Sequence, residues 1–294
     1  MRMIHTLAPA KINVFLRIIG RRLDGYHLLD SRMIPVSLYD EIHIEVDNEK
    51  SNQGTGESQF VLTCNEPAIP TNETNLVHRA AALLLREIGI QATVNIHLHK
   101  NIPPGAGLGG GSSDAASTLK SLNILLELGF SEEQLCQFGA RLGADIPFFI
   151  PCRPARVEGI GEILTPLPLL PHRWLVLVVP SFSVSTPWAY KQFDKLPPLE
   201  NQTPPANYAS GQWPTPGLLV NDLERAVFPS YPQIAEIKSA MSHLTAEGAL
   251  MSGSGSSVFG IFRDRMKAEK AAAILCQNGK TFLVEPLTGP PVSF

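Results

Sequence analysis

The stretch PPGAGLGGGSSDAAS, residues 103–117, places five glycines and three serines in fifteen positions. It follows ATVNIHLHK (92–100), in which polar and apolar residues alternate as in a strand with one polar face. After it, alanines and leucines keep helical spacing until Gly129. The glycine-rich stretch therefore joins a strand to the start of a helix.

Such a stretch can be a linker, a dinucleotide-binding turn or a cradle for phosphates. A linker is disfavoured because regular structure adjoins both ends. Gly105, Gly107 and Gly110 match the G-x-G-x-x-G pattern of dinucleotide-binding turns. That fold needs a continuously apolar strand before the glycines and an acid about 20 residues later, and the nearest acid, Glu127, falls inside the next helix. The Walker pattern fails as well, because no lysine follows the glycines.

A phosphate cradle explains the stretch better. Amide groups between Gly105 and Gly111 are not shielded by large side chains, so oxygens can approach them closely. Ser112 and Ser113 add hydroxyls at a helix N-terminus, where unpaired N–H groups and the helix dipole favour anions. A purely structural tight turn is the alternative that the local sequence leaves open.

Composition excludes several classes of protein. The chain has 294 residues, 44% of them hydrophobic and 17% charged, with a net charge of −3. These values argue against disorder and against a basic nucleic-acid-binding surface. The strongly apolar run WLVLVVP (174–180) is far shorter than the roughly 20 residues that span a bilayer. Four scattered cysteines form no disulfide or zinc pattern. We expect a cytoplasmic protein that binds a small molecule, with no nucleic-acid, membrane or obligate protein partner.

The first half of the chain alternates strands and helices. Residues 10–18 predict a half-buried strand with Lys11 and Asn13 on its polar face, and a second β-rich run continues to residue 46. Residues 48–58 read as an exposed hairpin loop. A helix is predicted over 74–89, capped by Thr74 and ended by Gly89.

Two further segments lead to the middle of the chain. Ser131 and Gln134 form a capping-box pair at the start of a short helix that ends near Gly143, and 144–150 is predicted to be extended. The Pro/Gly-rich segment 151–171 is the predicted domain boundary.

The second half contains the same kinds of element. We expect a buried strand at 173–180, an irregular excursion at 199–217 and helices at 232–244 and 263–279, with strands beside them. The interleaved strands and helices predict an α+β fold.

Two charged residues are candidates for chemistry. Asp145 lies after a helix end and before Pro147, in apolar surroundings, and could act as a base. The alternative is a structural role, in which its carboxylate accepts hydrogen bonds from the backbone amides of a turn. Lys11 could be its electrostatic partner, although exposed strand lysines are commoner. His97 and His99 share a strand face without a third ligand, so we expect no protein metal site there.

Three segments in order resemble the signature motifs of the GHMP small-molecule kinases: APAKINVFL (8–16), the glycine stretch and MSGSGSSVFG (251–260). DGYH (24–27) and GADIPFF (143–149) narrow the resemblance to members that phosphorylate a cytidine diphosphate derivative in the non-mevalonate isoprenoid pathway. Homoserine and mevalonate kinases, or a non-catalytic ligand-binding relative, are the alternatives.

The resemblance implies a two-domain α+β fold, with a ribosomal-protein-S5-like N-terminal domain and a ferredoxin-like C-terminal domain. We place these domains at residues 1–165 and 166–294. It implies ATP as phosphate donor, Mg²⁺ arriving with ATP without a dedicated protein carboxylate, Asp145 as base and Lys11 as its partner at a substrate 2-hydroxyl.

The resemblance also assigns residues to the two ligands. The expected ATP contacts are Lys100, Pro104, Gly105, Gly107, Leu108, Gly109, Gly110, Gly111, Ser112 and Ser113. The expected substrate contacts are Asn13, Tyr26, His27, Thr186, Pro187, Tyr190, Gly253 and Ser254, with Tyr26 and His27 at the cytosine.

Overall fold

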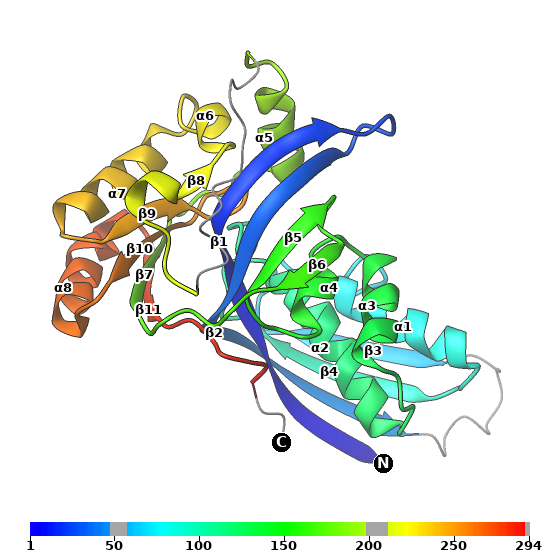
Figure 1. Ribbon diagram of the computed structural model, residues 1–294. Helices are drawn as coiled ribbons and strands as arrows, with labels where there is room; N and C mark the ends of the chain where they lie inside the picture. The colour runs from blue at the N-terminus through cyan, green and yellow to red at the C-terminus, as the bar shows by residue number, and fades with distance from the viewer. Residues whose placement is uncertain (48–57, 198–210, 292–294) are drawn as a thin grey trace.

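A computed structural model describes residues 1–47, 58–197 and 211–291 (Figure 1). Its central feature is a long antiparallel pair, β1 (Arg2–Arg21) and β2 (His27–Asp47), which runs through the middle of the molecule. Strand β1 contains the predicted strand but extends beyond it at both ends. The expected half-buried character was wrong, because Lys11 and Asn13 are 4% and 0% exposed. Their polar face turns toward other parts of the protein instead of toward water.

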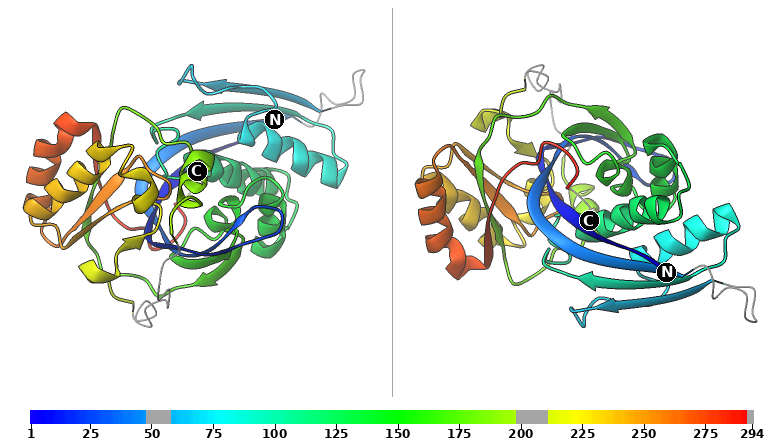
Figure 2. Two further views of the ribbon diagram at one scale, coloured as in Figure 1. Left: turned by 90° about the horizontal axis from the view of Figure 1, so that it is seen from above. Right: turned by 90° about the horizontal axis from the view of Figure 1, so that it is seen from below.

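The first sheet is built around this pair. Its strand order is β3 (Gln59–Cys64), β4 (Thr93–His99), β2, β1 and β8 (Val220–Asn221), and the hairpin of β5 (Ala155–Gly159) and β6 (Ile163–Pro166) pairs with β2. Four helices pack together on one face of the sheet, as both views of Figure 2 show. They are α1 (Leu76–Ile88), α2 (Gly110–Leu125), α3 (Glu132–Ala140) and α4 (Ile146–Phe149).

The second sheet contains four described strands, in the order β11 (Lys280–Val284), β7 (Trp174–Val179), β10 (Val258–Phe262) and β9 (Gly248–Met251), all antiparallel. Its helices are α5 (Thr186–Phe193), α6 (Glu224–Val227), α7 (Pro232–His243) and α8 (Arg265–Leu275), and 3₁₀ turns lie at Pro216–Leu218 and Cys276–Asn278. With α7 and α8 on one face, this strand–helix–strand–strand–helix–strand order is the expected ferredoxin-like arrangement.

The two halves share a core. Along β7, Val176 and Val178 pack with the helices α7 and α8, whereas Leu175 and Leu177 pack against apolar residues of β1 such as Ile12. Both faces of the second sheet are therefore buried, one by its own helices and one by the central pair. The α+β class is confirmed. The boundary at 165/166 falls within β6 and remains a prediction.

Three local predictions need correction or fall outside the description. Residues 144–150 are not extended: they form the turn of α4, because Pro147 sits in the first helical turn, where its missing N–H costs nothing. The N-cap of α1 is Asn75, not Thr74; the Asn75 carboxamide oxygen accepts from the Val77 amide at 2.8 Å. Residues 48–57 of the predicted loop and most of the excursion at 199–217 lie outside the described residues.

Other local predictions are confirmed. Gly89 ends α1 with a left-handed φ of 67°. Ser131 and Gln134 make both hydrogen bonds of a capping box at the start of α3. The buried strand of the second half is β7.

The N-cap correction is testable by a pair of alanine substitutions. Asn75→Ala removes the cap of α1 and the hydrogen bond from Asn75 Nδ2 to the Pro70 carbonyl (2.7 Å), so we expect a loss of about 1–2 kcal/mol in the free energy of unfolding. Thr74→Ala removes only an exposed bond to Asn72, and we expect a change within about 0.5 kcal/mol. Urea unfolding measures both, and equal losses would contradict the assignment.

Candidate active site

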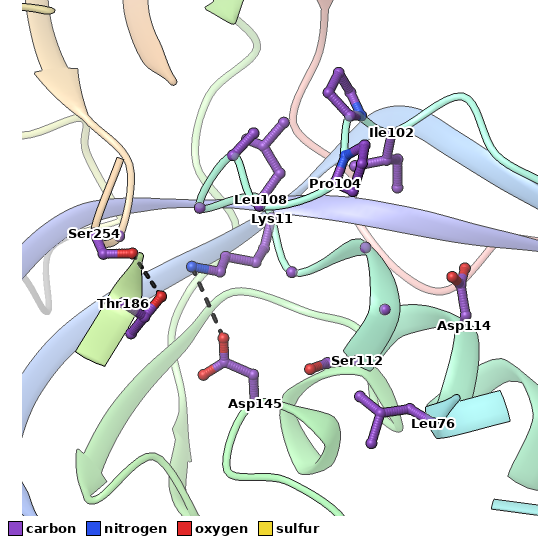
Figure 3. Close-up of a pocket in the computed structure, with 18 of the residues that line it drawn as sticks. Lys11, Leu76, Ile102, Pro104, Leu108, Ser112, Asp114, Asp145, Thr186 and Ser254 are labelled. Carbon is purple, nitrogen blue, oxygen red and sulfur yellow. Dashed lines mark hydrogen bonds and ion pairs between the residues drawn. The ribbon is translucent and has the colours of Figure 1, made fainter. Parts of the chain in front are cut away.

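A cavity of about 630 Å³ opens between the two halves of the molecule. The segments that line it include β1, the glycine loop (residues 103–111) that leads into α2, the N-terminal end of α4, helix α5 and the loop between β9 and β10. Figure 3 shows Lys11 and Asp145 facing each other from opposite walls of this cavity, with Ser254 and Thr186 at one side. Segments from both ends of the chain thus meet at one place.

Lys11 and Asp145 form the charged pair of the cavity. Lys11 Nζ lies 4.0 Å from Asp145 Oδ2, and the two side chains are 5% and 36% exposed. Burial lowers the pKa of Lys11, and the nearby Asp145 carboxylate partly opposes this effect. The result is a poorly hydrated ammonium beside a carboxylate that water or a ligand can reach.

Polar neighbours fix the position of Lys11. Its ammonium donates to Asn13 Oδ1 at 2.6 Å, and Asn13 Nδ2 donates to Ser31 Oγ at 2.8 Å. The Ser31 hydroxyl in turn donates to the Phe15 carbonyl at 2.7 Å. This chain joins β1 to β2 and keeps the carboxamide of Asn13 in one orientation. Lys11 and Asn13 lie on the same face of β1, are hydrogen-bonded to each other and both line the cavity.

The packing of α4 against the glycine loop fixes the position of Asp145. Residue Asp145 precedes the turn of α4, and the ring of Phe149 in that turn packs under Gly109. A Cβ on Gly109 would lie 2.8 Å from Phe149 Cζ and 3.1 Å from Lys11 Cγ. At the end of the turn, Lys120 Nζ donates to the Phe149 carbonyl at 3.0 Å. Only glycine lets α4, Lys11 and the loop approach so closely.

The glycine loop itself contacts the second half of the molecule. A Cβ on Gly107, where φ is +77°, would lie 2.2 Å from the Ser252 carbonyl oxygen. The Lys11 amide donates to the Leu108 carbonyl at 2.9 Å, which ties the loop to β1. Helix α2 begins at Gly110, so its first amides face the cavity lined by the loop. This is the arrangement expected of an anion cradle at a helix N-terminus.

Lys100 lies in a buried cluster that the sequence did not reveal. Its ammonium contacts Asp40 and donates to Asp114 Oδ2 at 2.7 Å. Asp40 Oδ1 also accepts from the Asn101 and Ile102 amides at 2.6 and 2.8 Å. Asp40 is on β2, 60 residues before Lys100, and no local pattern links the two. The cluster fixes the chain where it enters the glycine loop.

One buried lysine faces two aspartates in this cluster, so an excess negative charge would remain if both aspartates were ionised. Burial and the nearby Asp40 raise the pKa of Asp114 to about 8, although Lys100 opposes the rise. The two carboxylates raise the pKa of Lys100 despite its burial. Asp114 Oδ1 has no hydrogen-bond partner among the described residues. Asp114 thus retains a proton far above the usual range of an aspartate.

Most predicted site residues line the cavity. They are Lys11, Asn13, Lys100, Pro104, Gly105, Gly107, Leu108, Gly109, Gly110, Gly111, Ser112, Asp145, Thr186, Tyr190, Gly253 and Ser254. Thr186 Oγ1 and Ser254 Oγ are 2.8 Å apart, which closes the wall between α5 and the β9–β10 loop. Sequence reasoning missed the other end of the cavity. Ile69 and Leu76 form an apolar wall there, and Asn75 adds a side-chain carboxamide.

Four predicted residues do not line the cavity: Ser113, Tyr26, His27 and Pro187. Ser113 is fully buried, and Tyr26 is 61% exposed. His27 nevertheless stacks on Tyr190, with ring centroids 4.7 Å apart. Its Nε2 lies 2.6 Å from Asp194 Oδ1, and a carboxylate can only accept, so Nε2 carries a proton.

Elsewhere, a shallower cavity of about 420 Å³ lies over β2, β3 and β4 and includes His97 and His99. His97 Nδ1 contacts Thr63 Oγ1 at 2.5 Å. Within the described ranges, no group of three or more histidine, cysteine, aspartate or glutamate side chains could hold a metal ion. None of the described helices is long and apolar enough to cross a membrane.

Comparison with known families and proteins agrees with this architecture. The chain matches the model of the GHMP kinases N terminal domain over residues 75–152 and that of the GHMP kinases C terminal over residues 207–281. A 4-diphosphocytidyl-2-C-methyl-D-erythritol kinase from Citrifermentans bemidjiense is 42% identical over 273 residues, 93% of this chain and 94% of that protein. The kinase of the same name from Syntrophotalea carbinolica is 43% identical over 283 residues, 96% of this chain and 98% of that protein.

Solved structures give the same result. A crystal structure of 4-(cytidine 5'-diphospho)-2C-methyl-D-erythritol kinase has a TM-score of 0.78 and 36% identity, covering 96% of this chain and 98% of that one. Homoserine kinase from Cytophaga hutchinsonii has a TM-score of 0.75 at 18% identity, covering 100% of this chain and 97% of that one. At that identity the second likeness shows the fold alone.

The raised pKa of Asp114 predicts a specific dependence of stability on pH. In the unfolded chain an aspartate loses its proton near pH 4, whereas folded Asp114 keeps it to about pH 8. The native state binds more protons within this window, so this group makes the free energy of unfolding fall as pH rises. Asp114→Asn removes that dependence. Relative to wild type, we expect the variant to gain stability from about pH 4 to about pH 8 and no further above it.

Urea unfolding at a series of pH values measures this difference. The control is Asp24→Asn, because the Asp24 side chain is 44% exposed in the β1–β2 turn. A stability difference between Asp114→Asn and wild type that is independent of pH would contradict the protonated state of Asp114.

Proposed function

The chain belongs to the 4-diphosphocytidyl-2-C-methyl-D-erythritol kinases of the GHMP family, and we propose that Asp145 and Lys11 carry out its phosphoryl transfer. The reaction transfers the γ-phosphate of ATP to the 2-hydroxyl of 4-diphosphocytidyl-2-C-methyl-D-erythritol, a step of the non-mevalonate isoprenoid pathway. The enzyme is thus an ATP-dependent small-molecule kinase.

One observation carries the assignment of roles: the ammonium of Lys11 and the carboxylate of Asp145 face each other across the cavity that the glycine loop lines. Asp145 is the more accessible of the two, at 36% of its side chain. It can therefore meet a substrate hydroxyl, while Lys11 stays fixed by Asn13. The amides of the loop and the start of α2 offer the neighbouring place for the phosphates of ATP.

In the proposed step, the substrate 2-hydroxyl oxygen forms a bond to the γ-phosphorus as the bond from that phosphorus to the β–γ bridging oxygen breaks. The hydroxyl proton passes to Asp145, and ADP leaves with the electron pair of the broken bond. Lys11 stabilises the negative charge on the attacking oxygen and the transferring phosphoryl group. Its lowered pKa reflects poor hydration, so an anionic group beside it gains a strong partner.

We place the cytosine near α5. Tyr190 lines the cavity and stacks on His27, whose Nε2–H donates to Asp194. With its proton on Nε2, a neutral imidazole keeps a lone pair on Nδ1, which can accept from an exocyclic amine such as that of cytosine. Burial raises the pKa of Tyr190, so its ring stays neutral as a stacking surface. Tyr26, exposed at the β1–β2 turn, is proposed as a second aromatic contact with the cytosine. Thr186 and Pro187, at the start of α5, are proposed as further substrate contacts.

Mg²⁺ is proposed to enter with ATP. Asp114 is bound by Lys100 and is therefore not a free ligand for the ion. The cavity still fits Mg²⁺ that enters with ATP, because Mg²⁺ bound to nucleotide phosphates needs few protein ligands besides waters. The half-buried Ser112 hydroxyl, beside the loop amides, would be the protein oxygen for it. When bound, the ion neutralises charge on the phosphates.

We also propose a cytoplasmic location and activity without an obligate protein partner. The four cysteines Cys64, Cys136, Cys152 and Cys276 are free thiols, which suits a reducing compartment. Every group invoked above comes from one chain.

Substrate choice tests the proposed function. Purified protein, ATP and Mg²⁺ are incubated separately with 4-diphosphocytidyl-2-C-methyl-D-erythritol, homoserine and mevalonate, and ADP release is measured. We expect turnover of the cytidyl substrate alone. Turnover of only homoserine or mevalonate would assign the chain to another GHMP kinase, and no turnover of any would favour a non-catalytic relative.

Replacement of the carboxylate tests the role of Asp145. Asp145→Asn keeps the size of the side chain and removes its ability to take a proton, so we expect kcat to fall by about a hundredfold or more. ATP affinity, measured by calorimetric titration, should stay within about threefold of wild type because the loop is unchanged. A kcat near that of wild type would remove Asp145 from the mechanism.

A further inference from the structure

The loop between β9 and β10 reaches across to β1 through one buried hydroxyl. Ser252 Oγ accepts a hydrogen bond from the backbone N–H of Asn13 at 3.3 Å and donates to the Gly107 carbonyl at 3.1 Å. Ser252 is 0% exposed. A single side chain from the second half of the chain therefore contacts both the strand that carries Lys11 and the loop that lines the phosphate end of the cavity.

Surrounding contacts fix the backbone on either side of this hydroxyl. Asn221 Nδ2 donates to the Met251 and Gly253 carbonyls at 2.7 and 2.8 Å, on both sides of Ser252. The Ser252 amide donates to the Ser257 carbonyl at 2.9 Å, which closes the loop on itself. The serine is thus held in place by its own loop and by β8, independently of its contacts with β1 and the glycine loop.

We propose that Ser252 is a positioning residue that sets the distance between the glycine loop and Lys11. The proposal rests on the function given above and adds to it a residue from the second domain that does not touch the reacting atoms. Its hydroxyl suits this task because it accepts and donates at the same time. One partner, Asn13, is two residues from Lys11; the other, Gly107, is next to Leu108, whose carbonyl accepts from the Lys11 amide.

Close packing makes the position of this loop matter to Lys11. A Cβ on Gly253, the residue after Ser252, would lie 3.3 Å from Lys11 Nζ and 3.2 Å from the Gly107 carbonyl oxygen. A shift of the loop by a fraction of that distance would change the spacing of ammonium and phosphates. Displacements of about 1 Å at reacting groups can lower rates by about a hundredfold.

Removal of the hydroxyl tests the proposal, and the same loop provides a matched control. Ser252→Ala is compared with Ser257→Ala, because Ser257 is equally buried and its hydroxyl has no hydrogen-bond partner among the described residues. At saturating ATP and substrate, well below the melting temperature, we expect kcat to fall about tenfold in Ser252→Ala and to stay within about twofold in Ser257→Ala.

A double substitution separates positioning from a loss of stability. If Ser252 acts through Lys11, Ser252→Ala should lower the kcat of the Lys11→Met enzyme by less than about threefold, against about tenfold in wild type. A purely structural role would lower melting temperature in both backgrounds and leave the kcat of the folded enzyme unchanged. Equal kcat values for Ser252→Ala and Ser257→Ala would overturn the proposal, as would a full tenfold effect in Lys11→Met.

Ser252→Cys is the second variant if the alanine protein does not fold. It keeps most of the volume and replaces the hydroxyl by a weak donor and acceptor, so we expect an intermediate kcat; a kcat equal to that of wild type overturns the proposal. If wild type phosphorylates none of the three alcohols, the proposed function fails and this proposal with it. If wild type is active and Ser252→Ala matches Ser257→Ala, the Ser252 proposal alone fails.

Discussion

The site depends on how the backbone N–H groups of β1 that point away from β2 find hydrogen-bond acceptors. Amides along this outer edge of β1 do not pair with β2, and a buried N–H without an acceptor is costly. The glycine loop satisfies Lys11, the β9–β10 loop satisfies Asn13, and the Asp222 carboxylate accepts from Ile18 at 3.0 Å. Each acceptor comes from a different part of the chain. Satisfying one strand edge therefore brings the glycine loop and the second half of the molecule to the strand that carries the lysine.

The two buried lysines of the cavity differ in how their charge is compensated. Lys100 contacts the acidic side chains of Asp40 and Asp114, which raise its pKa despite burial. Lys11 has one carboxylate, 4.0 Å away, and its pKa is lowered. A buried cation with little compensation gains most from an incoming anion. This contrast favours Lys11 as the lysine that meets the transferring phosphoryl group, and it favours a supporting role for Lys100 at the start of the loop.

How far the sequence predicts the molecule depends on the range of the interactions. The strand–loop–helix order around the glycines, the Ser131 capping box and the alternating strand before the loop follow from neighbouring residues, and those predictions are confirmed. The burial of Lys11 could not follow, because a polar strand face reads the same whether it meets water or a cavity. The contacts of Lys100 with Asp40 and of Asn13 with Ser252 span 60 and 239 residues, beyond any local pattern. Resemblance to a family supplied the long-range grouping of Lys11 with Asp145, not their distance.

The glycines of the loop serve two different demands. Gly107 and Gly109 have no room for a Cβ, because Ser252 and Phe149 occupy that space at 2.2 and 2.8 Å. Their identity is therefore dictated by packing within the protein, whatever the ligand. Gly111 differs: a Cβ there would meet only Leu76, at 3.9 Å. It also lies in the first turn of α2, where alanine would favour the helix by up to about 1 kcal/mol. Packing gives no reason for a glycine at this position, which agrees with the proposed close approach of a ligand oxygen to the backbone.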